Sequence, residues 1–280
     1  HIDFVGLPFV QDDLKANKDL FQSIATVCTV NNNAQIIMQD GDFKRMGEPT
    51  EAALKVVAEK ICGQPTSIET AFKFEKETLG KIEVIGTLDF SSERKSMSTI
   101  VKGYKNKIDT LLKGAPDRVL KKCTHFMGLG GKKEMTQADR DQISKELGNL
   151  ASQGLRCLAI AEIPEGGVLR GIDESNKQTY LADIQKYSDY EQQAVFLGVI
   201  CIKDPVRNGI SECIEQCNTA GIRVIMITGD SKETATAIAE QIGIIKPDSD
   251  KAKSVFTGDQ FHAMTDAQRK EALKGHQGKV

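Results

Sequence analysis

The sequence predicts an α/β protein made of two regions. The first, residues 1 to about 200, mixes short predicted strands and helices with polar connections. The second, from about residue 199 to 245, alternates strands that are apolar throughout with amphipathic helices. That pattern is typical of a parallel sheet covered on both faces. The length of 280 residues also favours two domains, since a single domain has about 100–150 residues.

Proline, threonine and glycine mark the predicted helix ends of the first region. Pro49 and Pro116 each stand in the first turn of a predicted helix. Proline is tolerated there because a backbone N–H in the first turn has no hydrogen-bond acceptor within the helix. A longer amphipathic helix begins after Thr136, which can cap it, and ends at Gly154. Residues 164–193 are Gly-rich and then acidic, which predicts a surface loop with one short helix. Four apolar segments predict strands: KIEVIGTLDF, MSTIVKG, KNKIDTLLKG and LRCLAIAEI.

In the second region, two apolar strands each lead into a helix. The first strand covers 194–202 and its helix 207–218, and the second strand covers 222–228 and its helix 232–242. Ligands of open parallel sheets bind beyond the carboxyl ends of the strands. The Thr-Gly-Asp sequence at 228–230 stands at such an end and can cradle a phosphoryl oxygen with a hydroxyl and backbone N–H groups. The same three residues also fit an ordinary turn that caps the helix.

The composition excludes several classes of protein. Lys and Arg number 37 and Asp and Glu 39, giving a net charge of −2, whereas a general nucleic-acid binder has a strong basic excess. The longest apolar run, 194–202, is nine residues long, against about 20 for a membrane span. The chain begins with neither Met nor a basic region before an apolar stretch. We therefore expect no secretory signal and interpret the chain as a piece of a longer protein.

The cysteines and histidines predict neither disulfides nor a metal site. The seven cysteines are odd in number, scattered and without a CxxC pair, which indicates free thiols in a reducing compartment. Cys213 and Cys217 lie one helical turn apart, but no further Cys or His stands near them to complete a metal site. The motifs HExxH, GxSxG and GxxxxGK[ST] are absent, so zinc proteases, serine hydrolases and Walker-type nucleotide sites lose their usual support.

Several residues at strand ends and helix starts suit a nucleotide. Lys113 and Gly114 end a strand, where lysine can pair with a phosphate and glycine allows a close approach. Phe90 can stack on a purine, with Lys95 supplying charge to the phosphates. Taken singly, each also fits a structural role, as a core aromatic or a solvated cation. Three more charged residues stand at the start of a predicted helix or strand: Glu48 and Glu51 around Pro49, and Arg156. Each fits a nucleotide contact or an ordinary structural role, such as an acid near a helix N-terminus or a solvated cation.

The order of six motifs resembles that in P-type cation-transporting ATPases: GEPTEAAL, DFSSERKSM, LLKGAPDRVL, LRCLAIAEI, DPVRNGI and IRVIMITGD. The variants are most similar to those of calcium pumps of the sarco/endoplasmic reticulum kind, over residues 20–260. This resemblance implies an α+β nucleotide-binding domain with an antiparallel sheet over residues 1–203. Residues 204–280 would then form part of a Rossmann-like phosphorylation domain of haloacid-dehalogenase type, with a parallel sheet.

The resemblance also implies roles for single residues. Phe90 would stack on adenine, Glu51 would contact the adenine side and Leu158 would pack against the nucleoside. The other implied nucleotide residues are Glu48 near the metal–phosphate end, Lys95 and Lys113 lining the pocket, Gly114 at its floor and Arg156 at the phosphates. The implied residues of the phosphorylation domain are Thr228, Gly229 and Asp230 as a phosphate-binding motif and Asp204 at the hinge.

The sequence departs from the family pattern at one position and lacks two of its motifs. Ser92 stands where the calcium pumps have an Arg, so nucleotide affinity should be weaker here unless Arg94 compensates. The DKTGT segment with the nucleophilic Asp and the GDGxND segment that helps to hold Mg²⁺ do not occur in the 280 residues. The resemblance would place them before residue 1 and after residue 280. Phosphoryl transfer needs both, so we expect this chain alone to bind ATP or ADP without turnover.

The function that follows is that of an ATP-binding part of a calcium-transporting P-type ATPase. The whole pump would form an aspartyl-phosphate with ATP and Mg²⁺ and move calcium through membrane helices that lie outside these residues. This part would stand on the cytoplasmic face of an endoplasmic-reticulum-type membrane and bind no nucleic acid. Three alternatives remain at this point: a P-type ATPase for another cation, a dehalogenase-superfamily phosphatase with a large cap, and a non-catalytic adenine-nucleotide sensor.

Overall fold

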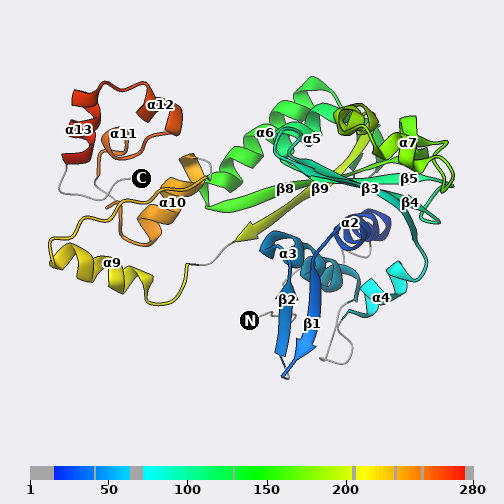
Figure 1. Ribbon diagram of the computed structural model, residues 1–280, viewed down its shortest axis with the longest axis horizontal. Coiled ribbons are helices and arrows are strands. Elements are labelled where there is room, and N and C mark those ends of the chain that lie inside the picture. Colours follow the sequence, from blue (N-terminus) through cyan, green and yellow to red (C-terminus); the bar gives the residue numbers. More distant parts are fainter. Residues whose placement is uncertain are drawn as a thin grey trace. The chain divides into compact units, whose positions relative to one another are not determined.

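The structure is a computed structural model (Figure 1). By their contacts, the residues fall into two compact units, one formed by 1–143 with 158–200 and the other by 144–157 with 201–280. The predicted domain boundary after residue 203 stays a prediction, because residues 204 and 205 are not among those described. The described residues are 16–40, 42–63, 72–128, 130–203, 206–229, 232–246 and 249–274.

A seven-stranded mixed sheet, in the order β3-β4-β5-β8-β9-β6-β7, organises the first unit. The pairs β3–β4, β4–β5, β5–β8 and β6–β7 are antiparallel and β6–β9 is parallel. A separate antiparallel hairpin joins β1 and β2. The strands are β1 (Gln35–Gln39), β2 (Asp42–Met46), β3 (Glu83–Ser91), β4 (Ser96–Lys102), β5 (Asp109–Gly114), β6 (Cys123–Gly128), β7 (Gly131–Glu134), β8 (Leu155–Ile163) and β9 (Ala194–Lys203). The mixed α/β class is thereby confirmed.

The helices of the first unit begin where the sequence signals place them. Pro49 and Pro116 open α3 and α5. The hydroxyl of Thr136 accepts a hydrogen bond from the N–H of Asp139 (3.2 Å) ahead of α6, and Gly154 follows that helix with a φ of +74°. The helices up to residue 152 are α2 (Lys18–Val30), α3 (Pro49–Ala58), the π-helical turn η1 (Glu59–Gly63), α4 (Lys73–Leu79), α5 (Pro116–Lys122) and α6 (Gln137–Ser152).

The two faces of the sheet are covered differently. Figure 1 shows α2 and α3 on one side of β4 and β5, and α5 on the other. On the α2 side, the side-chain amide of Asn31 donates to the carbonyls of Met97 (2.9 Å) and Leu111 (3.1 Å), which fixes the end of the helix to both strands. A cluster of buried apolar residues forms part of the core of this unit: Ile85, Leu88, Ile100, Ile108, Leu169, Ile172, Tyr187 and Tyr190.

Residues 164–193, predicted as a surface loop with one short helix, are more structured and partly buried. They form several short helical pieces, and Tyr187, Tyr190 and Glu191 are buried among them. The prediction was therefore wrong on burial, because two tyrosines anchor a polar segment to the core. The pieces are η3 (Pro164–Leu169), α7 (Lys177–Leu181), η4 (Ile184–Lys186) and α8 (Tyr187–Tyr190).

In the second unit, the strand predicted over 222–228 does not join a sheet among the described residues. Only Ile225 forms an isolated bridge, and Ile227 is 93% exposed. The first predicted strand, β9, pairs instead within the seven-stranded sheet. A strand needs neighbouring strands to pair with, and among the described residues this segment pairs only through the Ile225 bridge. The helices here are α9 (Ile210–Thr219), α10 (Lys232–Gln241), α11 (Lys251–Ser254), α12 (Gly258–His262) and α13 (Asp266–Lys274).

The apolar residues of the second unit gather around the end of α10. Ala239, Ile242, Ile244, Ile245 and Val255 are buried together, with partly buried residues of 206–226 packed against them. Helix α9, by contrast, has no buried residue. Among the described helices, none combines the length and the apolar composition that crossing a bilayer requires.

Backbone packing leaves no room for a side chain at Gly114, the last residue of β5. A Cβ built at this position would lie 2.5 Å from the carbonyl oxygen of Lys95 and 2.9 Å from the Cα of Ser96. Both are backbone atoms, so neither can rotate away. The N–H of the next residue, Ala115, donates to the same Lys95 carbonyl at 2.8 Å. Glycine at 114 thus lets β5 close against the turn that precedes β4.

Replacing Gly114 by Ala should destabilise the fold by about 1–3 kcal/mol, the usual cost of overpacking a tight contact. Urea unfolding followed by circular dichroism measures the change. The matched control is Gly148→Ala in α6, where nothing lies within 4 Å of the added Cβ. There, alanine should stabilise the exposed helix by about 0.5–1 kcal/mol. A Gly114→Ala variant as stable as the parent chain would contradict this account of the contact.

Candidate functional site

Lys113 and Glu51, both predicted nucleotide residues, form an ion pair at the end of α2. The side chain of Lys113 is 8% exposed and that of Glu51 16%, and Nζ to Oε1 measures 2.5 Å. Lys113 also donates to the carbonyl of Asn31 (2.5 Å). The second oxygen of Glu51 accepts from the N–H of Asn33 (3.1 Å). The two residues are brought together from β5 and α3 around the last turn of α2.

The protonation of Lys113 reflects two opposing effects. Burial lowers the pKa of Lys113, and the hydrogen bond and negative charge of Glu51 oppose that change. Because Glu51 already compensates the ammonium group, an anionic ligand that reaches Lys113 has to compete with this carboxylate.

Strand register gathers several of the other predicted residues at one end of the sheet. Ser96, Gly114 and Ala159 lie side by side across β4, β5 and β8. Lys95 immediately precedes Ser96 and Leu158 immediately precedes Ala159. Since β4 and β8 both run antiparallel to β5, Lys95 and Leu158 lie toward the same end of their strands. Lys95 is exposed and Leu158 half-buried.

Phe90 lies close to the same end, near the last residue of β3. It is 62% exposed, so the alternative of a core phenylalanine is wrong. The register of β3 against β4 shifts between Leu88 and Ser91, and this bulge interrupts the alternation of inward and outward side chains. An aromatic ring held in solvent near the end of a strand is available for stacking on a flat ligand.

The described contacts do not test the roles of the remaining predicted residues. Glu48 is the exposed residue before α3 and its side chain does not cap that helix. Arg156 is exposed on β8, two residues before Leu158. Thr228 and Gly229 are exposed, and Asp204 and Asp230 lie outside the described residues. The roles of these residues stay predictions.

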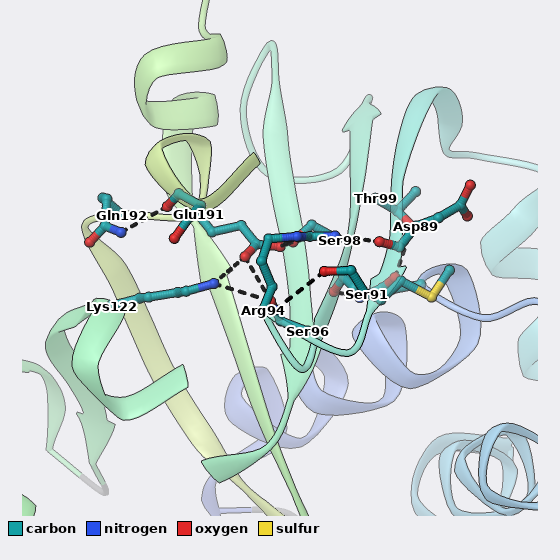
Figure 2. A network of polar contacts seen from close by, with 12 residues as sticks. Asp89, Ser91, Arg94, Ser96, Ser98, Thr99, Lys122, Glu191 and Gln192 are labelled. Carbon is teal, nitrogen blue, oxygen red and sulfur yellow. Dashed lines mark hydrogen bonds and ion pairs between the residues drawn. The ribbon is translucent and has the colours of Figure 1, made fainter. Parts of the chain in front are cut away.

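Sequence reasoning missed the most heavily bonded charge near the site, Glu191. Its side chain is fully buried between two cations (Figure 2). One oxygen accepts from Arg94 (2.5 Å) and from the hydroxyl of Ser98 (2.6 Å). The other accepts from Lys122 and from the hydroxyl of Ser96 (2.7 Å). Four donors therefore satisfy one carboxylate, which makes it a rigid buried junction.

The Glu191 network fixes the turn between Phe90 and Lys95. Arg94 donates from its other terminal nitrogen to the carbonyl of Asp89, and its guanidinium lies 5.0 Å from the centre of the Tyr187 ring. The residues on both sides of the turn are thus held by one buried cation. The sequence suggested Arg94 as a substitute for the family Arg. Its side chain is instead buried and bonded to Glu191, which holds it away from that role.

Burial alone would raise the pKa of Glu191, but the charge and hydrogen bond of Lys122, the Ser98 hydroxyl and Arg94 outweigh it and lower the pKa. A lowered pKa means that the folded state favours the carboxylate. The network therefore stabilises the fold fully above the ordinary pKa of 4.5. It loses this effect as the pH falls through the lower pKa of the folded state.

Replacing Glu191 by Gln should cost about 3–5 kcal/mol of stability, because Arg94 and Lys122 stay buried without their anion. Urea unfolding at neutral pH measures the loss. The variant should also show a weaker fall in stability below pH 4.5 than the parent chain, since the titrating group is gone.

Asp189→Asn is the matched control for Glu191→Gln, because it removes an exposed carboxylate two residues away. It should change stability by less than about 0.5 kcal/mol. Equal stability losses in the two variants would rule out a special role for the buried carboxylate.

Comparison with known proteins identifies the family. The family described as "P-type ATPase, cytoplasmic domain N" matches residues 20–209. The chain is 35% identical over 263 residues to calcium-transporting ATPase 4, endoplasmic reticulum-type, of Arabidopsis thaliana, covering 90% of this chain and 24% of that protein. It is 31% identical over 302 residues to the endoplasmic reticulum calcium ATPase srcA of Aspergillus fumigatus, covering 98% and 30%. The chain thus spans about a quarter of the length of these curated relatives. It belongs to the P-type ATPase family, and residues 20–209 correspond to its cytoplasmic domain N.

Proposed function

We propose that the chain is the ATP-binding part of a calcium-transporting P-type ATPase. Relatives at 31–35% identity are named calcium-transporting ATPases of the endoplasmic reticulum, which supports calcium over another cation. The match to domain N argues against a phosphatase with a cap. The observation on which the proposal rests is the sheet end that combines an exposed Phe90 with Lys95 and the Lys113–Glu51 pair.

At this sheet end each residue would perform one task. Phe90 would stack on the adenine, because its ring is exposed and aromatic stacking accepts any base face. Leu158 would add an apolar contact to the nucleoside. Lys95 would supply charge to the phosphates from the exposed turn. Lys113 would meet the ligand at the floor of the site, where Gly114 lets the turn before β4 close against β5.

In the whole pump, ATP held here would be delivered to an Asp of the phosphorylation domain, and Mg²⁺ would accompany its phosphates. We propose residues 1–203 as the nucleotide-binding domain and 204–280 as part of the phosphorylation domain. Arg156, Thr228, Gly229 and Asp230 would act on the phosphate side of that reaction, and Asp204 would stand at the hinge between the two domains. No three His, Cys, Asp or Glu side chains gather as a metal site in the described part of the chain. The pump would present this part on the cytoplasmic face of its membrane.

Isothermal titration of the chain with ATP and ADP tests the proposal. Phe90→Ala should weaken ATP binding by about 1–3 kcal/mol if the ring stacks on the base. Ile184→Ala is the matched control, because Ile184 is an apolar side chain with a similar exposure, 63% against 62%, outside the proposed site. Folded protein that binds no nucleotide at millimolar concentration would refute the proposal, as would a Phe90→Ala variant of full affinity.

Ser92→Arg should strengthen ATP binding, because position 92 bears an Arg in the resembling pumps and Arg94 is committed to Glu191. An exposed ion pair contributes about 0.2–1 kcal/mol, so we expect a gain of up to about fivefold. Ser92→Gln, which adds length without charge, is the control. The gain should appear with ATP and be absent with adenosine, and an equal gain with adenosine would contradict a phosphate contact.

A further inference from the structure

Two cysteines of neighbouring strands bring their sulfurs into contact. Cys157 is the third residue of β8 and Cys201 is the third from the end of β9, and the two strands are hydrogen-bonded neighbours in the sheet. Their Sγ atoms lie 3.7 Å apart, and both thiols are free. The two thiols are therefore in contact where the start of β8 lies beside the end of β9.

This geometry is close to that of a disulfide. Residues that face each other on neighbouring strands have Cα atoms about 4.5–5.5 Å apart, which falls inside the range of about 4.4–6.8 Å that disulfides adopt. The remaining change is a rotation of the two side chains that shortens the 3.7 Å contact to a bond of about 2.0 Å. The sheet does not have to be rebuilt.

The two thiols differ in their exposure to solvent, and this difference determines which of them an oxidant reaches first. Cys201 is exposed and Cys157 half-buried. Burial, followed by the neighbouring Cys201, raises the pKa of Cys157 to about 12, so Cys157 is a thiol at neutral pH and a poor first target. Its S–H can donate to the carbonyl of Leu155 (3.8 Å), which leaves its lone pairs free toward Cys201. An oxidant from solvent therefore meets Cys201 first.

We propose that Cys157 and Cys201 form a reversible oxidation site that closes to a disulfide under a hydroperoxide. The Cys201 sulfur attacks the peroxide, the O–O bond breaks, and a sulfenic acid and one water (for H₂O₂) are formed. The Cys157 sulfur then attacks the sulfenic sulfur, the S–O bond breaks, and a second water leaves with the thiol proton. Two thiols lose two electrons and the peroxide gains them. A dithiol reverses the reaction by exchange.

The bond would act on the strand that carries two proposed nucleotide residues. Cys157 stands between Arg156 and Leu158, so a bond from its sulfur to β9 would restrict how far the strand that holds both neighbours can adjust when a ligand binds. This consequence rests on the proposed nucleotide function, whereas the disulfide itself does not. We expect oxidation to weaken ATP binding threefold or more.

Peptide mapping tests whether Cys157 and Cys201 form a disulfide. The chain is treated with hydrogen peroxide, remaining thiols are blocked with N-ethylmaleimide, and a tryptic digest is analysed without reduction. Each of the peptides 157–170 and 187–203 contains a single Cys. They should appear as one linked species that separates with dithiothreitol. Cys201→Ser should abolish the linked species, and Cys213→Ser, which changes another exposed thiol, should leave it intact. Linkage of Cys201 to a different cysteine, or a Cys157 that stays open to maleimide after peroxide, would overturn the proposal.

Nucleotide titration of the oxidised and the reduced chain then tests whether the disulfide weakens ATP binding. Weaker ATP binding by oxidised parent chain, restored by dithiothreitol and absent in peroxide-treated Cys201→Ser, would support it. Equal affinities in both redox states would overturn the coupling, although the mapped disulfide would stand. Absence of binding in the reduced chain would count against the proposed function and not against the thiol pair.

Discussion

The hydrogen bonds and ion pairs of the buried Glu191 carboxylate are the interactions on which the proposed nucleotide end of the sheet depends. A carboxylate taken out of water is expensive unless donors surround it, and here two cations and two hydroxyls do so. This single carboxylate thereby joins the segment 186–193, helix α5 and the turn before β4. Loops seldom hold their shape by apolar packing alone, so a satisfied charge supplies the rigidity that the turn needs.

The Lys113–Glu51 pair has a different purpose from the Glu191 network. Glu191 has no open side, whereas the Lys113–Glu51 pair is partly exposed and lies on the opposite face of the sheet, against α2. Gly114, the residue after Lys113, lets β5 and the turn before β4 touch. A rigid junction on one face and an exchangeable ion pair on the other suit a site that keeps its shape while its charges find new partners.

Much of the fold could be predicted from local signals, because those signals act locally. Prolines at helix starts and alternating or apolar strand patterns depend on a few neighbouring residues, and α3, α5, β4 and β8 followed from them. The fate of 222–228 depends on strand partners that its own sequence does not encode. Glu191 was missed for a similar reason, since only the Tyr187–Tyr190 pair before it indicated burial. The sequence did not show whether Phe90 is buried or exposed, because the irregularity in β3 that accompanies its exposure is visible only in the strand register. Motif order found the family because it sums many weak signals along the chain.

The Glu191 network also leaves an unbalanced charge. Arg94 and Lys122 face one carboxylate, so these three side chains together carry one unit of positive charge next to the turn that ends in Lys95. Embedded charge is screened far less by salt than charge on a mobile side chain. In the proposed nucleotide site, such a charge would draw polyanions toward the sheet end before any contact forms. Electrostatic steering of this kind would govern how fast a polyphosphate arrives, while the aromatic face would govern how long it stays.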